Sequence, residues 1–248
     1  KKNKVRQRLL KIRAKKVIIA TGSIERPLIF NNNDRPGIML SSAVKKYADY
    51  YGVVCGKKTV FFTNNDSAYE SAISLNKKGL SVESIIDIRE KSDSELVKEV
   101  EKIGIQIYWS HTVVDVRGYK RLKEIIIMPL SKDGMSVIEK KINLKCDCLA
   151  IAGGWTPAVH LFTQSGGKLK FREEDQVFLP NVSQSKQISI GSCNGDFKLN
   201  EIIKNLIINV KNFLEIKNTE YDNLKIECPS DNVKKNIWLL PSNKVIGK

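Results

Sequence analysis

Three short apolar runs in this sequence end in glycine. They are Val17-Ile-Ile-Ala-Thr-Gly22, residues 148–152 before Gly153-Gly154, and residues 187–190 before Gly191. Glycine has no Cβ, so at the carboxyl end of a parallel strand it lets the phosphates or ribose of a dinucleotide approach the backbone. Any one of these glycines could also simply end a strand. Taken together they predict a cofactor-binding edge made by Ala20, Thr21, Gly22, Gly153, Gly154 and Gly191.

A second candidate edge follows the buried run at residues 59–62. A dinucleotide-binding turn there would read G-x-G-x-x-G, but its glycine places hold Thr63, Asn65 and Ala68. Asn65 is a poor substitute, because the backbone must touch a pyrophosphate at this place. Asp87 stands about 20 residues on, where an acid binds a ribose. We expect a Rossmann scaffold that has lost or altered its ligand, with Arg89 solvated rather than bound to a 2′-phosphate.

The cysteines and histidines point to no catalytic or metal centre. Cys146 and Cys148 have C-x-C spacing instead of the C-x-x-C of a redox pair, and on a strand they would point the same way. Buried structural thiols are the favoured interpretation. His111 is expected in a turn, and His160 could face a cofactor or partner. Without a Ser/His/Asp grouping, a carboxylate pair or a P-loop, we predict no catalytic residue and no metal ligand.

Composition excludes several classes of protein. The net charge is +15, but the first sixteen residues alone carry nine basic and no acidic side chains. No zinc-finger spacing or aromatic RNA-binding motif accompanies this charge, so nucleic-acid binding is not expected. The apolar runs are far shorter than the roughly 20 residues of a membrane span. Five cysteines and no secretory signal indicate a reduced, cytoplasmic protein, and a start without Met suggests a fragment.

The predicted elements alternate between strand and helix. A strand at 59–62, a helix at 68–78 and a strand at 82–88 predict a parallel pair. A helix at 41–51 should begin at a Ser41 or Ser42 cap. The remaining elements are two strands within 5–21, a helix at 94–103, strands at 105–109, 112–118, 122–128 and 137–144, and a helix at 199–216.

The order of the glycine segments indicates how the domains are arranged. The run that ends at Gly22 resembles the "ATG" segment of two-dinucleotide-binding-domain flavoproteins, and Cys146-Asp-Cys-Leu-Ala-Ile-Ala-Gly-Gly-Trp-Thr-Pro157 resembles their later segment. The resemblance implies an α/β, pyridine nucleotide-disulfide reductase-like Rossmann architecture whose first domain is incomplete. Residues 1–56 and 146–213 would form part of that first domain, and 57–145 an inserted Rossmann-like domain. Residues 214–248 would be a linker toward a missing C-terminal domain.

Longer strings resemble the alpha subunits of heterotetrameric sarcosine oxidases. The most specific are Phe62-Thr-Asn-Asn-Asp-Ser-Ala-Tyr69, Gly153-Gly-Trp-Thr-Pro-Ala-Val-His-Leu161 and Gln164-Ser-Gly-Gly-Lys-Leu169. The resemblance implies a middle fragment that contributes an NAD-binding domain to a complex that demethylates sarcosine to glycine. NAD would bind the first Rossmann half, which needs an N-terminal glycine loop not present in this sequence. FAD or FMN and folate would lie elsewhere, and the partners would be the beta, gamma and delta subunits.

Two departures keep alternatives open. Flavoproteins of this architecture usually have Gly-Asp where this chain has Gly191-Ser192, which argues against FAD in the first site. The chain could belong to another FAD/NAD-dependent amine or opine oxidoreductase. It could also be a non-catalytic interaction domain that keeps a Rossmann scaffold.

Overall fold

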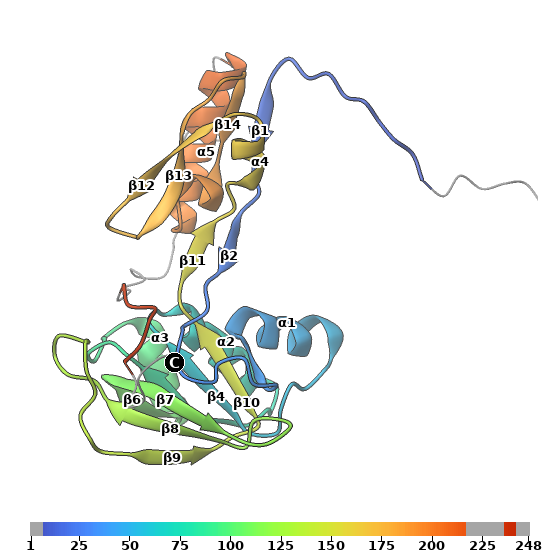
Figure 1. Ribbon diagram of the computed structural model, residues 1–248. Coiled ribbons are helices and arrows are strands. Elements are labelled where there is room, and N and C mark those ends of the chain that lie inside the picture. The colour runs from blue at the N-terminus through green and yellow to red at the C-terminus, as the bar shows by residue number, and fades with distance from the viewer. Residues whose placement is uncertain (1–6, 217–235, 242–248) are drawn as a thin grey trace, which may run out of the picture. The chain divides into compact units, whose positions relative to one another are not determined.

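The computed structural model describes residues 7–216 and 236–241 of the 248-residue chain. The chain divides into two compact units (Figure 1). Unit 1 comprises Lys1–Ser23 and Pro157–Glu227, and unit 2 comprises Ile24–Thr156 and Cys228–Lys248. The divisions fall within two short strands that pair with each other, β2 (Ser23–Glu25) and β11 (Trp155–Pro157).

Unit 2 is built on a parallel five-stranded sheet. The strand order is β3 (Ile38–Leu40), β10 (Cys148–Ala152), β4 (Thr59–Thr63), β5 (Val82–Asp87) and β6 (Gln106–Trp109). Every residue of β4 and β10 is buried, as expected for strands covered on both faces. The expected α/β fold with a parallel sheet is therefore confirmed.

Different layers cover the two faces of this sheet (Figure 1). Phe61 and Ala150 point to the face of the sheet that is covered by the helices α1 (Ser41–Tyr51), α2 (Ser67–Lys77) and α3 (Glu95–Ile103). Val60 and Phe62 face the other way, because successive strand side chains alternate. They pack against an antiparallel sheet of β7 (His111–Arg117), β8 (Glu124–Pro129) and β9 (Ile142–Lys145).

The domain boundaries expected from the sequence need correction. Residues 1–56 and 146–213 were expected in one domain and 57–145 in another. Instead β10 lies between β3 and β4, with Leu149 opposite both Ile38 and Val60. Backbone hydrogen bonds thus hold both flanking segments in the sheet of unit 2. Ile18 lies in unit 1 and Ile151 in unit 2, so the observed divisions lie at Ser23 and Thr156.

Unit 1 contains only a small core. Its parallel pair is β1 (Val17–Ile19) with β14 (Gln187–Ser189), and β12 (Lys168–Arg172) pairs with β13 (Val177–Val182) as an antiparallel hairpin. The other elements are α4 (His160–Gln164), the 3₁₀ helix η1 (Gly191–Asn194) and α5 (Leu199–Leu214). Val17 and Ile18 are 44% and 38% exposed, and α5 buries no residue completely. Within the described ranges, the parallel sheet of unit 1 has only two strands.

Several local expectations differ from the structure. Residues 7–14 form no strand, and the hairpin of β12 and β13 was not predicted. The cap of α1 is Leu40, and the backbone N–H of Ser42 donates to the buried Glu25 carboxylate at 2.9 Å. The Glu25 carboxylate of β2 thus accepts a hydrogen bond at the start of α1, where a serine cap was expected to accept it.

The expected linker at 214–248 lies largely outside the described residues. Its described part, 236–241, packs within unit 2. Leu240 is buried, and the backbone N–H of Ile29 donates to the Trp238 carbonyl at 2.7 Å. The Arg26 guanidinium lies over the Trp238 ring, 4.2 Å from its centroid. For these six residues the linker prediction is wrong, because apolar side chains anchor them to the unit.

Candidate functional site

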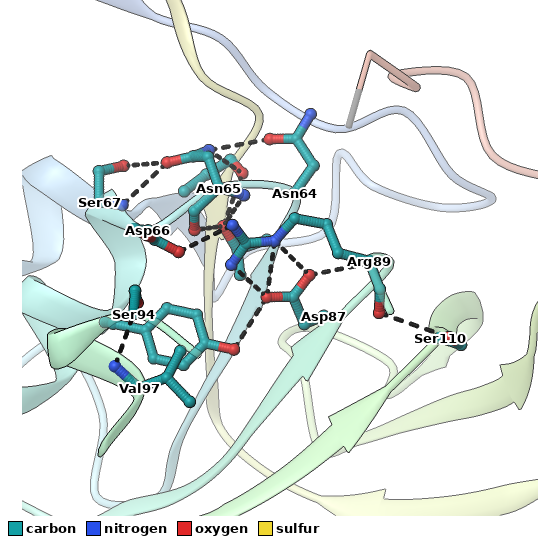
Figure 2. A network of polar contacts seen from close by, with 12 residues as sticks. Asn64, Asn65, Asp66, Ser67, Asp87, Arg89, Ser94, Val97 and Ser110 are labelled. Carbon is teal, nitrogen blue, oxygen red and sulfur yellow. Dashed lines mark hydrogen bonds and ion pairs between the residues drawn. The ribbon is translucent and has the colours of Figure 1, made fainter. Parts of the chain in front are cut away.

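The turn between β4 and α2 is held by its own side chains (Figure 2). The Asn65 side chain accepts from the Ser67 backbone N–H at 2.9 Å and donates to the Ala152 carbonyl at 3.1 Å. The Thr63 hydroxyl donates to the Asn65 carbonyl at 2.8 Å. In a working phosphate loop, backbone N–H groups at such a helix start point at the ligand. Here an amide oxygen already accepts the first of these N–H groups.

The expected ribose-binding acid is also occupied. Asp87, at the end of β5, is fully buried and accepts from the Arg89 guanidinium at 2.7 Å and from the Tyr69 hydroxyl at 2.8 Å. Arg89 pairs in addition with Asp66, at 2.7 Å. Figure 2 shows the guanidinium enclosed between these two carboxylates. Arg89 is itself buried, so the expectation of a solvated side chain is wrong.

Burial and ion pairing act in opposite directions on the charges of this cluster. Burial opposes the charge of Arg89, but the hydrogen bonds and charge of Asp87, and then of Asp66, raise its pKa above the usual value. Burial raises the pKa of Asp87, and the hydrogen bonds and charge of Arg89 act in the opposite sense. Burial and then the charge of Asp87 raise the pKa of Tyr69, which stays neutral. We call Asp66, Asp87, Arg89 and Tyr69 the arginine cluster.

The strand-end edge of unit 2 therefore does not fit a dinucleotide. Its pyrophosphate place is bridged by Asn65 and its ribose acid is neutralised by Arg89. The sequence signalled the first change through the missing glycines. It did not signal the second, because the spacing of Asp87 and Arg89 does not reveal that Asp66 completes a buried ion-pair network.

Gly153 and Gly154 follow β10 in unit 2, and both form backbone hydrogen bonds with Arg26. The Gly153 N–H donates to the Arg26 carbonyl at 2.7 Å, and the Arg26 N–H donates to the Gly154 carbonyl at 2.7 Å. A Cβ on Gly153 would lie 2.7 Å from the Arg26 carbonyl oxygen and 2.9 Å from that of Pro27. At Gly153 the close approach that requires glycine is therefore made by the chain itself, whereas a Cβ on Gly154 would meet nothing within 4 Å.

Unit 1 brings the remaining expected residues together. Gly22 and Gly191 follow the adjacent parallel strands β1 and β14 and have φ of +73° and +71°. A Cβ on Gly22 would lie 3.9 Å from the Ser192 hydroxyl oxygen, so the two strand ends are neighbours. The Thr21 hydroxyl donates to the Ala158 carbonyl at 2.6 Å, which fixes the first turn.

This edge is exposed and ends in two sharp turns. Ala20 and Thr21 are exposed, and the positive φ at Gly22 and Gly191 turns the chain sharply as each strand ends. Open, glycine-containing ends of neighbouring parallel strands are where doubly wound sheets bind nucleotides. Within 7–216 and 236–241, unit 1 supplies no glycine-rich loop for the pyrophosphate. Of the six expected residues, Ala20, Thr21, Gly22 and Gly191 thus share one edge.

The cysteines behave as structural residues. Cys146 and Cys148 are buried, and burial raises the pKa of each thiol to about 12. They pack in the cores on opposite faces of the sheet, because regular strand geometry begins only at Cys148. The expectation that they point the same way is wrong. His111 begins β7, and His160 is exposed at the start of α4.

Neither a metal-binding cluster nor a membrane-spanning helix occurs in the described part of the chain. No group of three or more His, Cys, Asp or Glu side chains in it could hold a metal ion. None of its helices is both long and apolar enough to cross a membrane.

Solved structures with similar folds include a reductase and a dehydrogenase. Thioredoxin reductase from T. acidophilum is 19% identical with a TM-score of 0.56, covering 74% of this chain and 59% of that one. L-proline dehydrogenase from P. horikoshii is 20% identical with a TM-score of 0.54, covering 83% of this chain and 36% of that one. These similarities show the fold and confirm the reductase-like Rossmann architecture.

No family model matches the chain. Curated relatives are more similar in sequence than these solved structures. The sarcosine oxidase subunit alpha of Corynebacterium sp. (strain P-1) is 37% identical over 194 residues, and that of Rhizobium meliloti (strain 1021) is 33% identical over 195 residues. These alignments cover 77% and 75% of this chain but only 20% and 18% of the relatives. The chain is therefore a relative of sarcosine oxidase alpha subunits that spans about a fifth of their length.

Proposed function

We propose that this chain is the reductase-like part of a sarcosine oxidase alpha subunit, and that unit 1 contributes to an NAD site. The complex would oxidatively demethylate sarcosine to glycine. The observation that carries the proposal is the difference between the two strand-end edges. Unit 1 keeps an open edge at Thr21, Gly22 and Gly191, whereas unit 2 fills its own edge with Asn65 and Arg89.

Exposed apolar surface supports a larger first domain. In a doubly wound fold the central strands are covered on both faces. In the described residues, Val17 and Ile18 of β1 and Leu206 and Ile208 of α5 remain substantially exposed. A preceding strand, glycine loop and helix would cover such a surface and would supply the pyrophosphate contacts that Gly22 and Gly191 cannot make.

Unit 2 has a different proposed role. A filled nucleotide edge and a well-packed sheet favour a structural scaffold for this unit. FAD or FMN and folate elsewhere, partner subunits of beta, gamma and delta type, and a cytoplasmic location belong to the same proposal, because they follow from the resemblance. The competing assignments for the whole chain are a subunit of another FAD/NAD-dependent amine or opine oxidoreductase and a non-catalytic Rossmann interaction domain.

The test compares Gly22→Val with Gly79→Val in the full-length chain within its complex. Both glycines have positive φ, +73° and +74°, so backbone strain is matched. Gly79 follows Lys78, the C-cap of α2 in unit 2, and a Cβ there meets nothing within 4 Å. We expect Gly22→Val to reduce the amount of NAD bound per complex, while sarcosine still reduces the flavin in stopped-flow experiments. Gly79→Val should change neither the NAD content nor the flavin reduction. Loss of flavin reduction with full NAD occupancy in Gly22→Val would contradict the proposal.

A further inference from the structure

Three exposed tyrosines lie together on α1. Tyr50 and Tyr51 are 77% and 58% exposed, and Tyr47 and Val53 beside them are also exposed. The Tyr50 and Tyr51 rings meet edge to face with centroids 4.9 Å apart, and the Tyr47 and Tyr51 centroids are 5.7 Å apart. The Val53 N–H donates to the Tyr47 carbonyl, which places Val53 beside them. We call Lys46, Tyr47, Tyr50, Tyr51 and Val53 the α1 face.

A groove continues from this face toward α2. It has a volume of about 380 Å³, and Tyr50 and Trp155 provide its aromatic walls. Its remaining lining residues are Glu25, Ser42, Lys45, Lys46, Asp49, Ser67, Glu70 and Ser71. A groove of this size accommodates one or two side chains of another polypeptide. Figure 1 shows α1 beyond the β10 side of the parallel sheet.

The charges along α1 are unequally satisfied. Lys45 pairs with Glu70, and Asp49 lies 3.5 Å from the Lys78 ammonium and accepts from the Ser74 hydroxyl at 2.9 Å. Lys46 makes no ion pair with the described residues. The charge left unmatched on the α1 face is therefore positive, which favours a partner that carries carboxylates.

The aromatic character of the face distinguishes it from α5. The exposed side chains of α5 are Leu and Ile, which suit permanent burial inside one domain. Tyrosine instead offers a large apolar ring and a hydroxyl that stays hydrated while the surface is free, and it is enriched where separate chains meet. Tyrosine is also among the residue types that contribute most of the binding energy at such interfaces.

We propose that the α1 face is a docking surface for a different polypeptide of the same complex. The docked segment inserts an apolar side chain between Tyr50 and Trp155 and places an Asp or Glu near Lys46. This inference rests on the proposed function, because it takes from the relatives, which are named as subunits, that other chains are present.

The test uses a photo-crosslinking phenylalanine analogue at Tyr50 of the full-length chain, expressed with its natural partner chains. The matched control carries the analogue at Tyr119, which is 91% exposed and lies between β7 and β8. Mass spectrometry identifies each crosslinked peptide. We expect Tyr50 to crosslink to another polypeptide, at a peptide with Asp or Glu within a few residues of the attachment point, and Tyr119 not to do so.

A second arm measures affinity for the partner polypeptide identified in this way. Tyr50→Ser and Lys46→Glu should each weaken association at least about tenfold, whereas Tyr119→Ser should leave it unchanged. Thermal unfolding of the chain should not change, because these side chains are exposed. Crosslinks only within the same chain, only between two copies of it, or none at all would overturn the inference. NAD occupancy in Tyr50→Ser separates this failure from a failure of the proposed function, which predicts full occupancy.

Discussion

Replacing Arg89 by methionine tests whether the arginine cluster is a structural lock. Methionine keeps most of the length of the side chain but removes the charge between Asp66 and Asp87. The side chains of Arg89, Asp66 and Asp87 are 5%, 5% and 0% exposed, so water cannot replace the lost cation. Removing one partner of a buried ion pair costs about 3–5 kcal/mol. Loss of the cation 5.8 Å from the centre of the Tyr69 ring adds about 0.5–1 kcal/mol.

We therefore expect Arg89→Met to lower the free energy of unfolding by about 4 kcal/mol, a large part of the ~5–15 kcal/mol typical of a domain. For a chain of this size the midpoint of thermal unfolding should fall by about 8–16 °C. The assay is calorimetric and urea unfolding of the full-length chain. Arg117→Met is the control, because Arg117 pairs with Glu124 at 3.3 Å and is 62% exposed. That exposed pair should contribute no more than about 1 kcal/mol.

The deficit of Arg89→Met should also depend on pH. Burial raises the pKa of Asp87, and without Arg89 nothing of comparable strength opposes that rise. A carboxyl whose pKa is higher in the folded than in the unfolded state stabilises the fold at low pH, and loses this effect as the pH rises. The deficit should therefore be smaller at pH 5 than at pH 8. If Arg89→Met is no less stable than Arg117→Met but loses affinity for NADP, Arg89 is a ligand-binding residue and our reasoning is refuted.

Three further predictions concern single side chains. Burial raises the pKa of Glu25 above its ordinary value of 4.5, and hydrogen bonds from Ser42 oppose this. The free energy of unfolding of the wild type, relative to that of Glu25→Gln, should therefore be greatest below pH ~4.5 and should decline as the pH rises through the folded pKa of Glu25. Urea unfolding midpoints of both proteins across this pH range measure the difference. A difference that grows with rising pH would contradict the prediction. Gly153→Ala should cost about 1–3 kcal/mol, because the new Cβ would lie 2.7 Å from the Arg26 carbonyl oxygen; an unchanged unfolding midpoint would show that this approach can relax. Asn65→Gly should lose about 1 kcal/mol through its cap-like bond to the start of α2, and should add no second NAD per chain in calorimetric titration; a second equivalent would show that unit 2 retains a site.

Periodicity and glycine placement predicted most elements of unit 2, because its strands are short buried runs and its helices end at clear breakers. The helix at 41–51 and the strand at 148–152 match α1 and β10. The domain boundary could not be read in the same way. The residues of β10 do not predict its pairing with β3 and β4, because this pairing depends on backbone hydrogen bonds between segments far apart in the sequence.

The candidate site shows the same limit. The missing glycines at Thr63 and Asn65 predicted a lost or altered ligand, and in the structure the Asn65 side chain accepts a hydrogen bond from the first N–H of α2. The role of Arg89 depends on Asp66, 23 positions earlier in the sequence, so local spacing could not reveal it. Gly153 was expected to face a cofactor because glycine permits any close approach. The sequence does not distinguish the approach of a ligand from that of a neighbouring backbone.

The most direct test of the central claim is an experimental structure of the full-length complex with NAD bound. Our account predicts that NAD contacts the strand ends at Thr21, Gly22 and Gly191 of unit 1, and that Arg89 remains paired with Asp87. NAD lying along the turn at Asn65 in unit 2, with Arg89 displaced from Asp87, would contradict it.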